Sequence, residues 1–162
     1  MIVGLLIALL VVVLDQVSKI AVYSYLLEVG KAVEVTSFFN LVSAWNTGVS
    51  FSMFSNLGVN GVFILSAFSL CVVGFLVYWL NKEKSLYMRV SLGFVIGGAI
   101  GNVIDRVRLG AVYDFLDVHV GAHHWPAFNV ADSFICIGAV LIVLDGIIFD
   151  RCGLNKKTEE IK

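Results

Sequence analysis

Four apolar runs, each long enough to cross a lipid bilayer, constrain this chain more than any other feature. A membrane-spanning helix takes about 20 residues, and runs of that length cover 3–23, 59–80, 88–106 and 129–149. The composition agrees, because 59% of the 162 residues are hydrophobic and only 14% are charged. The mean hydropathy is +0.95. The sequence therefore predicts an all-α membrane protein with four transmembrane helices.

The rest of the composition points to one domain and excludes some classes of protein. No fixed-period repeat and no Pro-rich or Ser-rich linker is present, so we expect a single domain over 1–162. The net charge of −1, without a basic patch, argues against nucleic-acid binding. We interpret the first run as a span and not as a cleaved leader, because no basic residue precedes it, no small-residue cleavage site follows, and Asp15 and Lys19 interrupt it at helical spacing. The three cysteines form no CxxC pair and imply no disulfide framework.

Basic residues concentrate on one side of the predicted helices. Seven lie in or beside the short connection after the second run, or in the tail: Lys82, Lys84, Arg89, Arg151, Lys156, Lys157 and Lys162. The two longer connections hold only Lys31, Arg106 and Arg108. By the positive-inside rule, we expect both termini, the short connection and the tail at 150–162 to be cytoplasmic.

The two longer connections are expected to form structure outside the membrane. The connection at 24–58 alternates at 31–35 and is rich in aromatic and branched residues at 38–44, which predicts strands of a small extracytoplasmic β-sheet. Four side chains are expected at headgroup depth as anchors: Trp45, Phe51, Met53 and Phe54. The connection at 107–128 is expected to form a second extracytoplasmic loop element.

Polar residues within three of the runs should lie at one depth. They are Asp15 and Lys19 in the first run, Asn102 and Arg106 in the third, and Asn129 and Asp132 in the fourth. The outer connection that carries Asp114 returns to the same depth. Ionisable groups inside a membrane are costly and usually functional, so their convergence predicts a site.

Asp114 and Asp132 bound the stretch DFLDVHVGAHHWPAFNVAD, and each stands where an apolar segment meets a loop. Two carboxyl groups around one water molecule can hydrolyse an amide when one accepts a proton from water and the other hydrogen-bonds the carbonyl. Their like charges separate their ionisation, so they titrate as a pair. A helix N-terminus favours the anion at Asp132, but the sequence does not assign the proton. This pattern favours an intramembrane aspartic peptidase.

Five motifs extend this hypothesis over nearly the whole chain. They are DQVSK at 15–19, NTGVSFS at 46–52, GGAIGNVIDR at 97–106, YDF at 113–115 and PAFNVAD at 126–132. In this order they resemble the lipoprotein signal peptidase family, the type II signal peptidases of bacteria. The resemblance implies a membrane protease that removes the signal peptide from prolipoproteins, cutting before a cysteine that carries diacylglycerol. The chain departs from the family pattern at Val49, Ser50 and Tyr113.

The resemblance also implies roles for single residues. Asp114 and Asp132 match the catalytic pair. Other positions match residues that shape the site and hold the substrate backbone: Asp15, Lys19, Asn46, Gly48, Asn102, Arg106 and Asn129. The family uses no metal and no cofactor, works at the outer face of the bacterial cytoplasmic membrane and is inhibited by the cyclic peptide globomycin. The expected partners are diacylglyceryl-modified prolipoproteins and membrane lipid, and we expect a monomer.

Structural interpretations of several of these residues stay open. Asp15 and Lys19 could be only a neutralising i,i+4 pair. The third run carries three glycines that are typical of close helix packing: Gly97, Gly98 and Gly101. Asp105 and Asp117 are typical of solvated charges near headgroups, and Asp145 favours a structural role.

Other functions compete with the peptidase hypothesis. Three histidines near Asp114 and Asp117 invite a zinc hypothesis, but their spacing fits no regular zinc site: His119, His123 and His124. An ion-coupled transporter or channel subunit would use the intramembrane charges as a pathway. A structural partner in a larger membrane complex would use them for helix association.

Overall fold

The computed structural model describes residues 1–30, 32–48 and 58–153. Its elements are α1 (Ile2–Val29), β1 (Ala32–Thr36), β2 (Phe39–Asn46), α2 (Gly58–Lys82), α3 (Leu86–Leu109), β3 (Val112–Val120), β4 (His123–His124) and α4 (Val130–Gly153). In the described chain, 4 helices are long and apolar enough to cross a membrane. The predicted fold class, four transmembrane helices with a small sheet, is confirmed.

Some predicted positions lie outside the described residues. They are the anchors Phe51, Met53 and Phe54, the departures Val49 and Ser50, and the basic residues Lys31, Lys156, Lys157 and Lys162.

Each helix ends beyond the apolar run that predicted it, and in α1 and α3 a glycine marks the end. α1 ends at Val29 and not at 23, and α3 ends at Leu109 and not at 106. In each case the helix continues to a glycine with positive φ: 123° at Gly30 and 74° at Gly110. The N–H of Gly30 donates to the carbonyl of Leu26 at 3.0 Å, which satisfies one of the last free carbonyls of α1. Hydropathy identifies the apolar stretch, whereas the glycine with positive φ determines where the helix ends.

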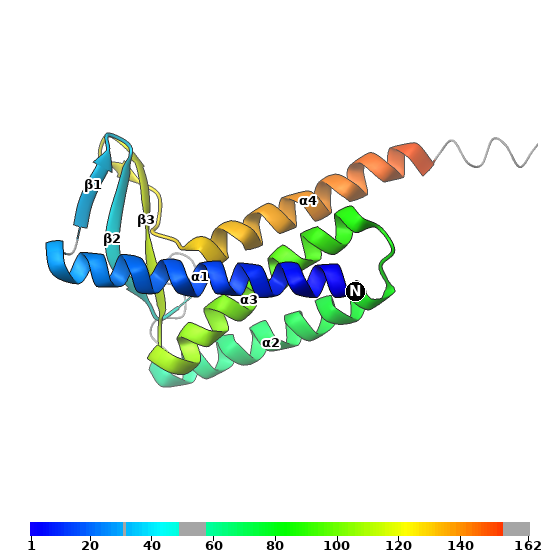
Figure 1. Ribbon diagram of the computed structural model, residues 1–162, viewed down its shortest axis with the longest axis horizontal. Helices are drawn as coiled ribbons and strands as arrows, with labels where there is room; N and C mark the ends of the chain where they lie inside the picture. Colours follow the sequence, from blue (N-terminus) through cyan, green and yellow to red (C-terminus); the bar gives the residue numbers. More distant parts are fainter. Residues whose placement is uncertain (31, 49–57, 154–162) are drawn as a thin grey trace, which may run out of the picture.

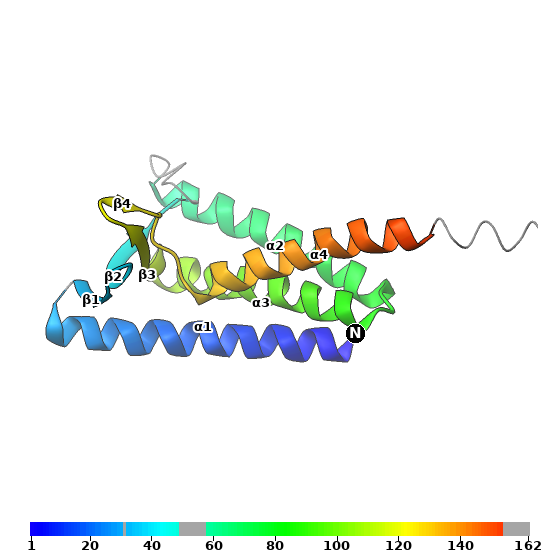
Figure 2. The ribbon, with the colours of Figure 1, turned by 90° about the horizontal axis from the view of Figure 1, so that it is seen from above.

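The helices run roughly alongside one another, and the sheet lies at one end (Figure 1). The N-terminus, the connection between α2 and α3, and the end of α4 lie at the other end (Figures 1 and 2). α3 packs against each of the other three helices. The apolar core lies among α1, α2 and α3, in the half far from the sheet, and includes Ala8, Leu80 and Leu92. The half near the sheet is therefore left for polar residues.

Glycines on α3 bring its neighbours into backbone contact. A Cβ atom at Gly97 would lie 2.6 Å from the carbonyl oxygen of Ala8 in α1. A Cβ atom at Gly98 would collide with the carbonyl oxygen of Ala131 in α4. Residues without a side chain allow helices to approach this closely. The packing interpretation of these glycines is confirmed.

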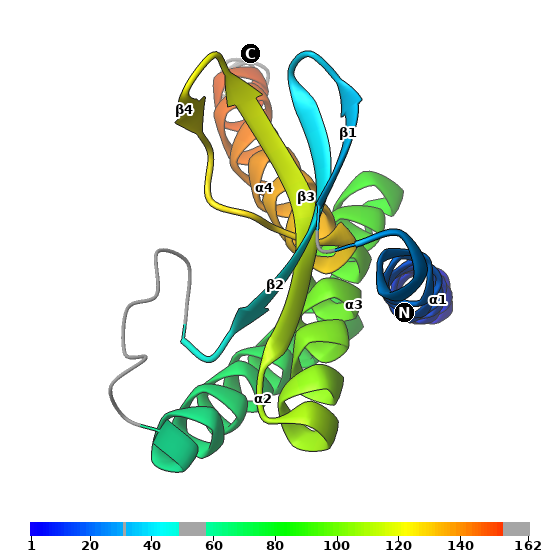
Figure 3. The ribbon, with the colours of Figure 1, turned by 90° about the vertical axis from the view of Figure 1, so that its left-hand side faces the viewer.

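The sheet is antiparallel with the order β1-β2-β3-β4. The strands expected near 31–35 and 38–44 are confirmed as β1 and β2. The connection at 107–128, expected as a separate loop element, contributes β3 and β4 to the same sheet. β3 crosses in front of the helices when the molecule is viewed from the end that carries the sheet (Figure 3). Its pairing places Ala44 opposite Asp114.

Candidate active site

The start of α4 fixes Asp132 through a reciprocal cap. Asn129 precedes the helix, and its Oδ1 accepts the N–H of Asp132 at 2.9 Å. Oδ2 of Asp132 in turn accepts the N–H of Asn129 at 3.4 Å. This arrangement is a capping box, and it places the Asp132 carboxylate in the first helical turn. Free backbone N–H groups and the helix dipole favour a negative charge there.

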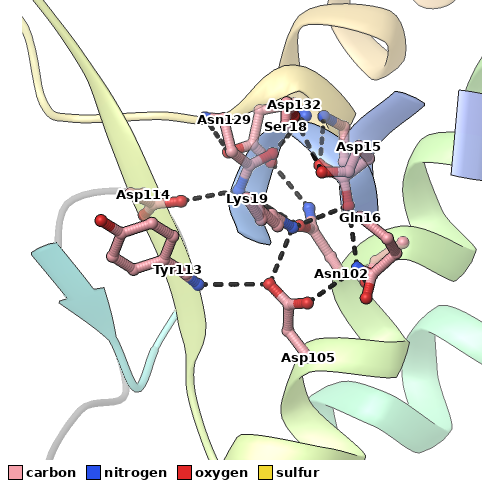
Figure 4. Close-up of polar contacts among 12 residues, drawn as sticks. Asp15, Gln16, Ser18, Lys19, Asn102, Asp105, Tyr113, Asp114, Asn129 and Asp132 are labelled. Carbon is pink, nitrogen blue, oxygen red and sulfur yellow. Dashed lines mark hydrogen bonds and ion pairs between the residues drawn. The ribbon is translucent and has the colours of Figure 1, made fainter. Parts of the chain in front are cut away.

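β3 brings Asp114 to the same place. Nδ2 of Asn129 donates to Oδ1 of Asp114 at 2.7 Å. Nδ2 of Asn46, at the end of β2, donates to Oδ2 of Asp114 at 3.1 Å. The single side chain of Asn129 therefore contacts both Asp114 and Asp132, and the two candidate catalytic residues meet in one site (Figure 4).

The surroundings of Asp114 make it hard to ionise. Burial, and then the negative charge of Asp132, raise the pKa of Asp114 to about 6. The hydrogen bonds from Asn46 and Asn129 stabilise the anion and oppose this rise. The charge of Asp132 therefore acts directly on the protonation of Asp114.

Asn102 joins this pair to the polar residues of α1. Its Nδ2 donates to Oδ1 of Asp132 at 2.8 Å. Its Oδ1 accepts hydrogen bonds from Nδ2 of Asn129 at 3.2 Å and from Nζ of Lys19 at 3.3 Å. Both groups of the Asn102 amide are engaged, so the network fixes its orientation.

A buried ion-pair cluster lies next to the candidate pair. Nζ of Lys19 lies 2.8 Å from Oδ2 of Asp15 and 2.7 Å from Oδ2 of Asp105. Asp15 is fully buried, and its Oδ1 also accepts the N–H of Ala131 at 3.0 Å. Asp15 and Lys19 are therefore more than an i,i+4 pair within α1, because they join α1 to α3 and α4.

The interpretation of Asp105 as a solvated charge is wrong. α3 continues past this residue, which is 2% exposed, and Lys19 and the N–H of Tyr113 both contact it. Gln16, which sequence reasoning missed, donates to Oδ1 of Asp105 at 2.9 Å. Its one signal was a polar amide inside an apolar run, beside Asp15.

Arg106 and Gly48 lie together at the end of α3 that is near the sheet (Figure 1). Nη2 of Arg106 donates to the carbonyl of Gly48 at 3.2 Å, and the N–H of Gly48 donates to Oδ1 of Asn46 at 3.0 Å. Nε of Arg106 is buried and makes no hydrogen bond within the described residues. A guanidinium group with an unused donor can bind a carbonyl oxygen or a carboxylate.

The histidines of the outer sheet form a separate group. Nδ1 of His124 lies 2.9 Å from both carboxylate oxygens of Asp117, and Nδ2 of Asn40 donates to Oδ2 at 2.9 Å. The rings of His119 and His124 stack with centroids 4.6 Å apart. Asp117 is 6% exposed, so its interpretation as a solvated charge is wrong. Within the described ranges, no three His, Cys, Asp or Glu side chains are placed to hold a metal ion. The zinc hypothesis gains no support.

These contacts define what the site can do chemically. Two carboxyl groups, one on a strand and one on a helix, are linked by shared amides and lie beside a compensated ion-pair cluster. Such a pair can bind one water molecule, accept a proton from it and polarise a carbonyl group.

Comparisons with known proteins lead in the same direction. The family model for signal peptidase (SPase) II matches residues 7–148. The lipoprotein signal peptidase of Aeromonas hydrophila subsp. hydrophila is 48% identical over 143 residues, which are 86% of this chain and 84% of that protein. That of Anaplasma phagocytophilum is 40% identical over 142 residues, which are 88% and 90% of the two chains.

Solved structures agree with the sequence comparisons. One bacterial membrane enzyme structure has a TM-score of 0.75 at 32% identity and covers 99% of this chain and 92% of its own. A second has a TM-score of 0.72 at 33% identity and covers 88% of this chain and 90% of its own. With a family match over residues 7–148 and relatives of 40% identity or more, this chain belongs to the signal peptidase II family.

Proposed function

We propose that this protein is a membrane aspartic endopeptidase that removes the signal peptide from diacylglyceryl-modified prolipoproteins, cutting before the lipidated cysteine. Membership of the signal peptidase II family supports a protease that acts on prolipoproteins. One structural observation supports the mechanism: a single residue, Asn129, contacts both carboxyl groups. Its side-chain Nδ2 donates to Asp114, and its backbone N–H donates to the carboxylate of Asp132.

The position of Asp132 at a helix N-terminus, which Asp114 lacks, assigns the roles of the two aspartates. Asp132 accepts hydrogen bonds from Asn102 and from the N–H of Asn129 in the first turn of a helix, which favours the anion. The pKa of Asp114 is raised to about 6 by burial and by the charge of Asp132, which favours its protonated form. A bound substrate excludes water and raises this pKa further. Asp132 is then the general base and Asp114 the proton donor.

The proposed reaction uses only these two groups and one water molecule. Asp132 takes a proton from water as the water oxygen attacks the scissile carbonyl carbon, and Asp114 donates its proton to the carbonyl oxygen. When the tetrahedral intermediate collapses, the C–N bond breaks, Asp132 passes its proton to the leaving amine and Asp114 recovers its own. The products are a signal peptide ending in a carboxylate and a lipidated cysteine with a free amino group. No metal or cofactor takes part.

The remaining site residues position the pair and the substrate. Asn46 and Asn102 each hold one carboxylate by a side-chain amide. Arg106, whose Nε makes no hydrogen bond within the described residues, is suited to bind the extended substrate chain, and Gly48 holds Arg106 in place. Asp15 and Lys19 hold the start of α4, and with it Asp132, against α1 and α3.

We place the protein in the bacterial cytoplasmic membrane with both termini in the cytoplasm and the site toward the outer face. The excess of basic residues in the short connection and the tail supports this orientation. The sheet and the N-terminus lie at opposite ends of the helices, which is consistent with it (Figure 1). Membrane lipid surrounds the four helices, and we propose that the enzyme acts as a monomer.

The deciding experiment compares purified wild type with Asp114→Asn and Asp132→Asn on a diacylglyceryl-modified prolipoprotein, followed by the gel shift on cleavage. Each substitution is expected to lower the rate at least about a hundredfold, because it removes a general acid or base. Asp117→Asn is the matched control, since it removes a carboxylate of the same sheet outside the pair. Cleavage by both variants at the wild-type rate would exclude the mechanism.

Three further experiments test the lipid requirement, the absence of a metal and the inhibition by globomycin. A precursor whose cysteine lacks diacylglycerol should be cut far more slowly, and equal rates would contradict lipid recognition. A chelator should leave the rate unchanged, and loss of activity that zinc restores would argue for a metal mechanism. Globomycin should inhibit wild type. If wild type leaves every precursor intact, the transporter hypothesis should be tested by measuring ion flux in liposomes.

A further inference from the structure

A cavity lies beside β3, the strand that carries Asp114. It has a volume of about 210 Å³ and lies between α1, the end of α3, and the strands β2 and β3. Tyr113 lines it, and successive residues of a strand point to opposite faces, so it lies on the other face of β3 from Asp114. Trp45 pairs with Tyr113 in the sheet and lines the same cavity. The proposed proteolysis does not use this cavity.

Aromatic rings form the outer wall of this cavity. Tyr23 of α1 packs edge-on against Trp45 and Tyr113, with centroids 5.9 and 5.5 Å apart. Trp45 is 47% exposed and Tyr23 is 39% exposed, so the wall opens to the outside. The hydroxyl of Tyr113 is buried. Rings with a polar edge are typical of the membrane–water interface.

Two charged residues that line the cavity, Lys19 and Asp105, already form an ion pair with each other. Lys19 lies between Asp15 and Asp105, and Gln16 donates to Asp105. Arg108, at the end of α3, differs from them. It is exposed, and its one contact within the described residues is from Nη1 to Oε1 of Gln16 at 3.5 Å, at the limit of a hydrogen bond. A guanidinium group has five N–H donors, so most of those of Arg108 are free to bind an anion.

The surface beside the cavity is apolar and outward-facing. Ile20 of α1 is 60% exposed and Leu109 of α3 is 54% exposed, and both line the cavity. Both helices have the length and hydropathy of membrane spans, so these side chains face lipid. An anion that occupies this place must therefore carry apolar chains as well.

We propose that this cavity binds the head of an anionic glycerophospholipid, with its phosphate on Arg108 and its acyl chains along Ile20 and Leu109. The cavity admits a headgroup but not the chains, which lie outside against α1 and α3. Arginine binds phosphate with two parallel hydrogen bonds. The diacylglyceryl group of a prolipoprotein carries no phosphate, so Arg108 selects bilayer lipid over substrate lipid.

The test is native mass spectrometry of purified wild type, Arg108→Gln and Lys84→Gln after incubation with dioleoylphosphatidylglycerol. Lys84 is an exposed cation in the connection between α2 and α3 and is the matched control for loss of one positive charge. We expect wild type and Lys84→Gln to retain this lipid equally. Arg108→Gln should retain it roughly fivefold less, the effect of one basic side chain near an anionic lipid. Arg108→Lys, which keeps the charge, should retain most of the binding.

Two further probes separate the parts of the ligand. Dioleoylglycerol has the chains without the phosphate, and its retention should not change in Arg108→Gln. Inorganic phosphate has the charge without the chains and should not displace the phospholipid. Equal retention by wild type and Arg108→Gln would overturn the proposal, as would an equal loss in Lys84→Gln or displacement by inorganic phosphate. These results report binding and do not depend on proteolysis.

Discussion

Nζ of Lys19 lies 2.7 Å from Oδ2 of Asp105, and this ion pair joins α1 to α3 with exposures of 5% and 2%. Removing the cation leaves Asp105 and Asp15 buried without a counter-charge. Lys19→Met should therefore lower the free energy of unfolding by about 3–5 kcal/mol. Thermal unfolding in detergent measures this effect, and the exposed Lys84→Met should change the midpoint little. Adding Asp105→Asn to Lys19→Met should recover part of the loss, and no recovery would mean that the ion pair does not carry the effect.

Asn46 tunes the protonation of Asp114. It donates to Oδ2 of Asp114, and this hydrogen bond stabilises the anion and opposes the rise of the pKa to about 6. Asn46→Ala should therefore raise the pKa of Asp114 further, by roughly half to one unit. Because the proposed mechanism needs Asp114 protonated, activity is present below this pKa and is lost as the pH rises through it. The falling limb of kcat/KM should move to higher pH in the variant.

The control for this pH profile is Asn40→Ala. Asn40 makes the equivalent side-chain hydrogen bond to Asp117, outside the proposed pair. In Asn40→Ala, kcat/KM should fall over the same pH range as in wild type. A limb that moves to lower pH in Asn46→Ala would reverse the assigned roles of the two aspartates.

Asp117 should make stability depend on pH. Burial alone would raise the pKa of this carboxyl group, but hydrogen bonds from Asn40 and His124 outweigh it and lower the pKa below its ordinary value. A lowered folded-state pKa adds stability above the unfolded value and loses it as the pH falls through the folded value. Asp117→Asn should therefore be less stable than wild type by about 1–2 kcal/mol at pH 6. The difference in the free energy of unfolding between wild type and Asp117→Asn should disappear in strongly acidic buffer.

The matched variant for this experiment is Glu34→Gln. Glu34 is an exposed carboxylate on β1 of the same sheet. Its midpoint of thermal unfolding should follow that of wild type at every pH. If the gap for Asp117→Asn stays constant down to pH 3, the effect does not come from its ionisation.

The glycines of α3 should tolerate no added methyl group. At Gly98 a Cβ atom would meet the backbone of Ala131 and the side chain of Ile135. Gly98→Ala should therefore lower the free energy of unfolding by about 1–3 kcal/mol, the usual cost of overpacking. Gly74→Ala in α2, where no atom lies within 4 Å, should be neutral or stabilising. Thermal unfolding separates the two outcomes, and equal midpoints would mean that α3 and α4 can move apart freely.

The apolar runs predicted the helices, because lipid imposes a length and a polarity on every span. Asp15, Lys19 and Asn102 meet as expected, since each helix carries its polar residues near the same end. The pairing of β2 with β3 could not be predicted, because strand pairing is a long-range choice that no local pattern encodes. That pairing places Asn46 beside Asp114.

Two aspartates were misjudged for one physical reason. The expectation that Asp105 and Asp117 are solvated rested on their position near the headgroups. Their partners are distant along the chain: Lys19 for Asp105 and Asn40 for Asp117. A carboxylate can be buried only when the fold brings such a partner next to it. The composition of the surrounding sequence does not predict this contact.

The residues of the site come from α1, the end of β2, α3, β3 and the start of α4. Asn129 and Asp132, which complete it, belong to the start of α4. A nascent chain that enters the membrane from its N-terminus therefore holds Asp114 without its partner until the final span is inserted. On the proposed mechanism, a newly made molecule therefore stays inactive until α4 has been inserted.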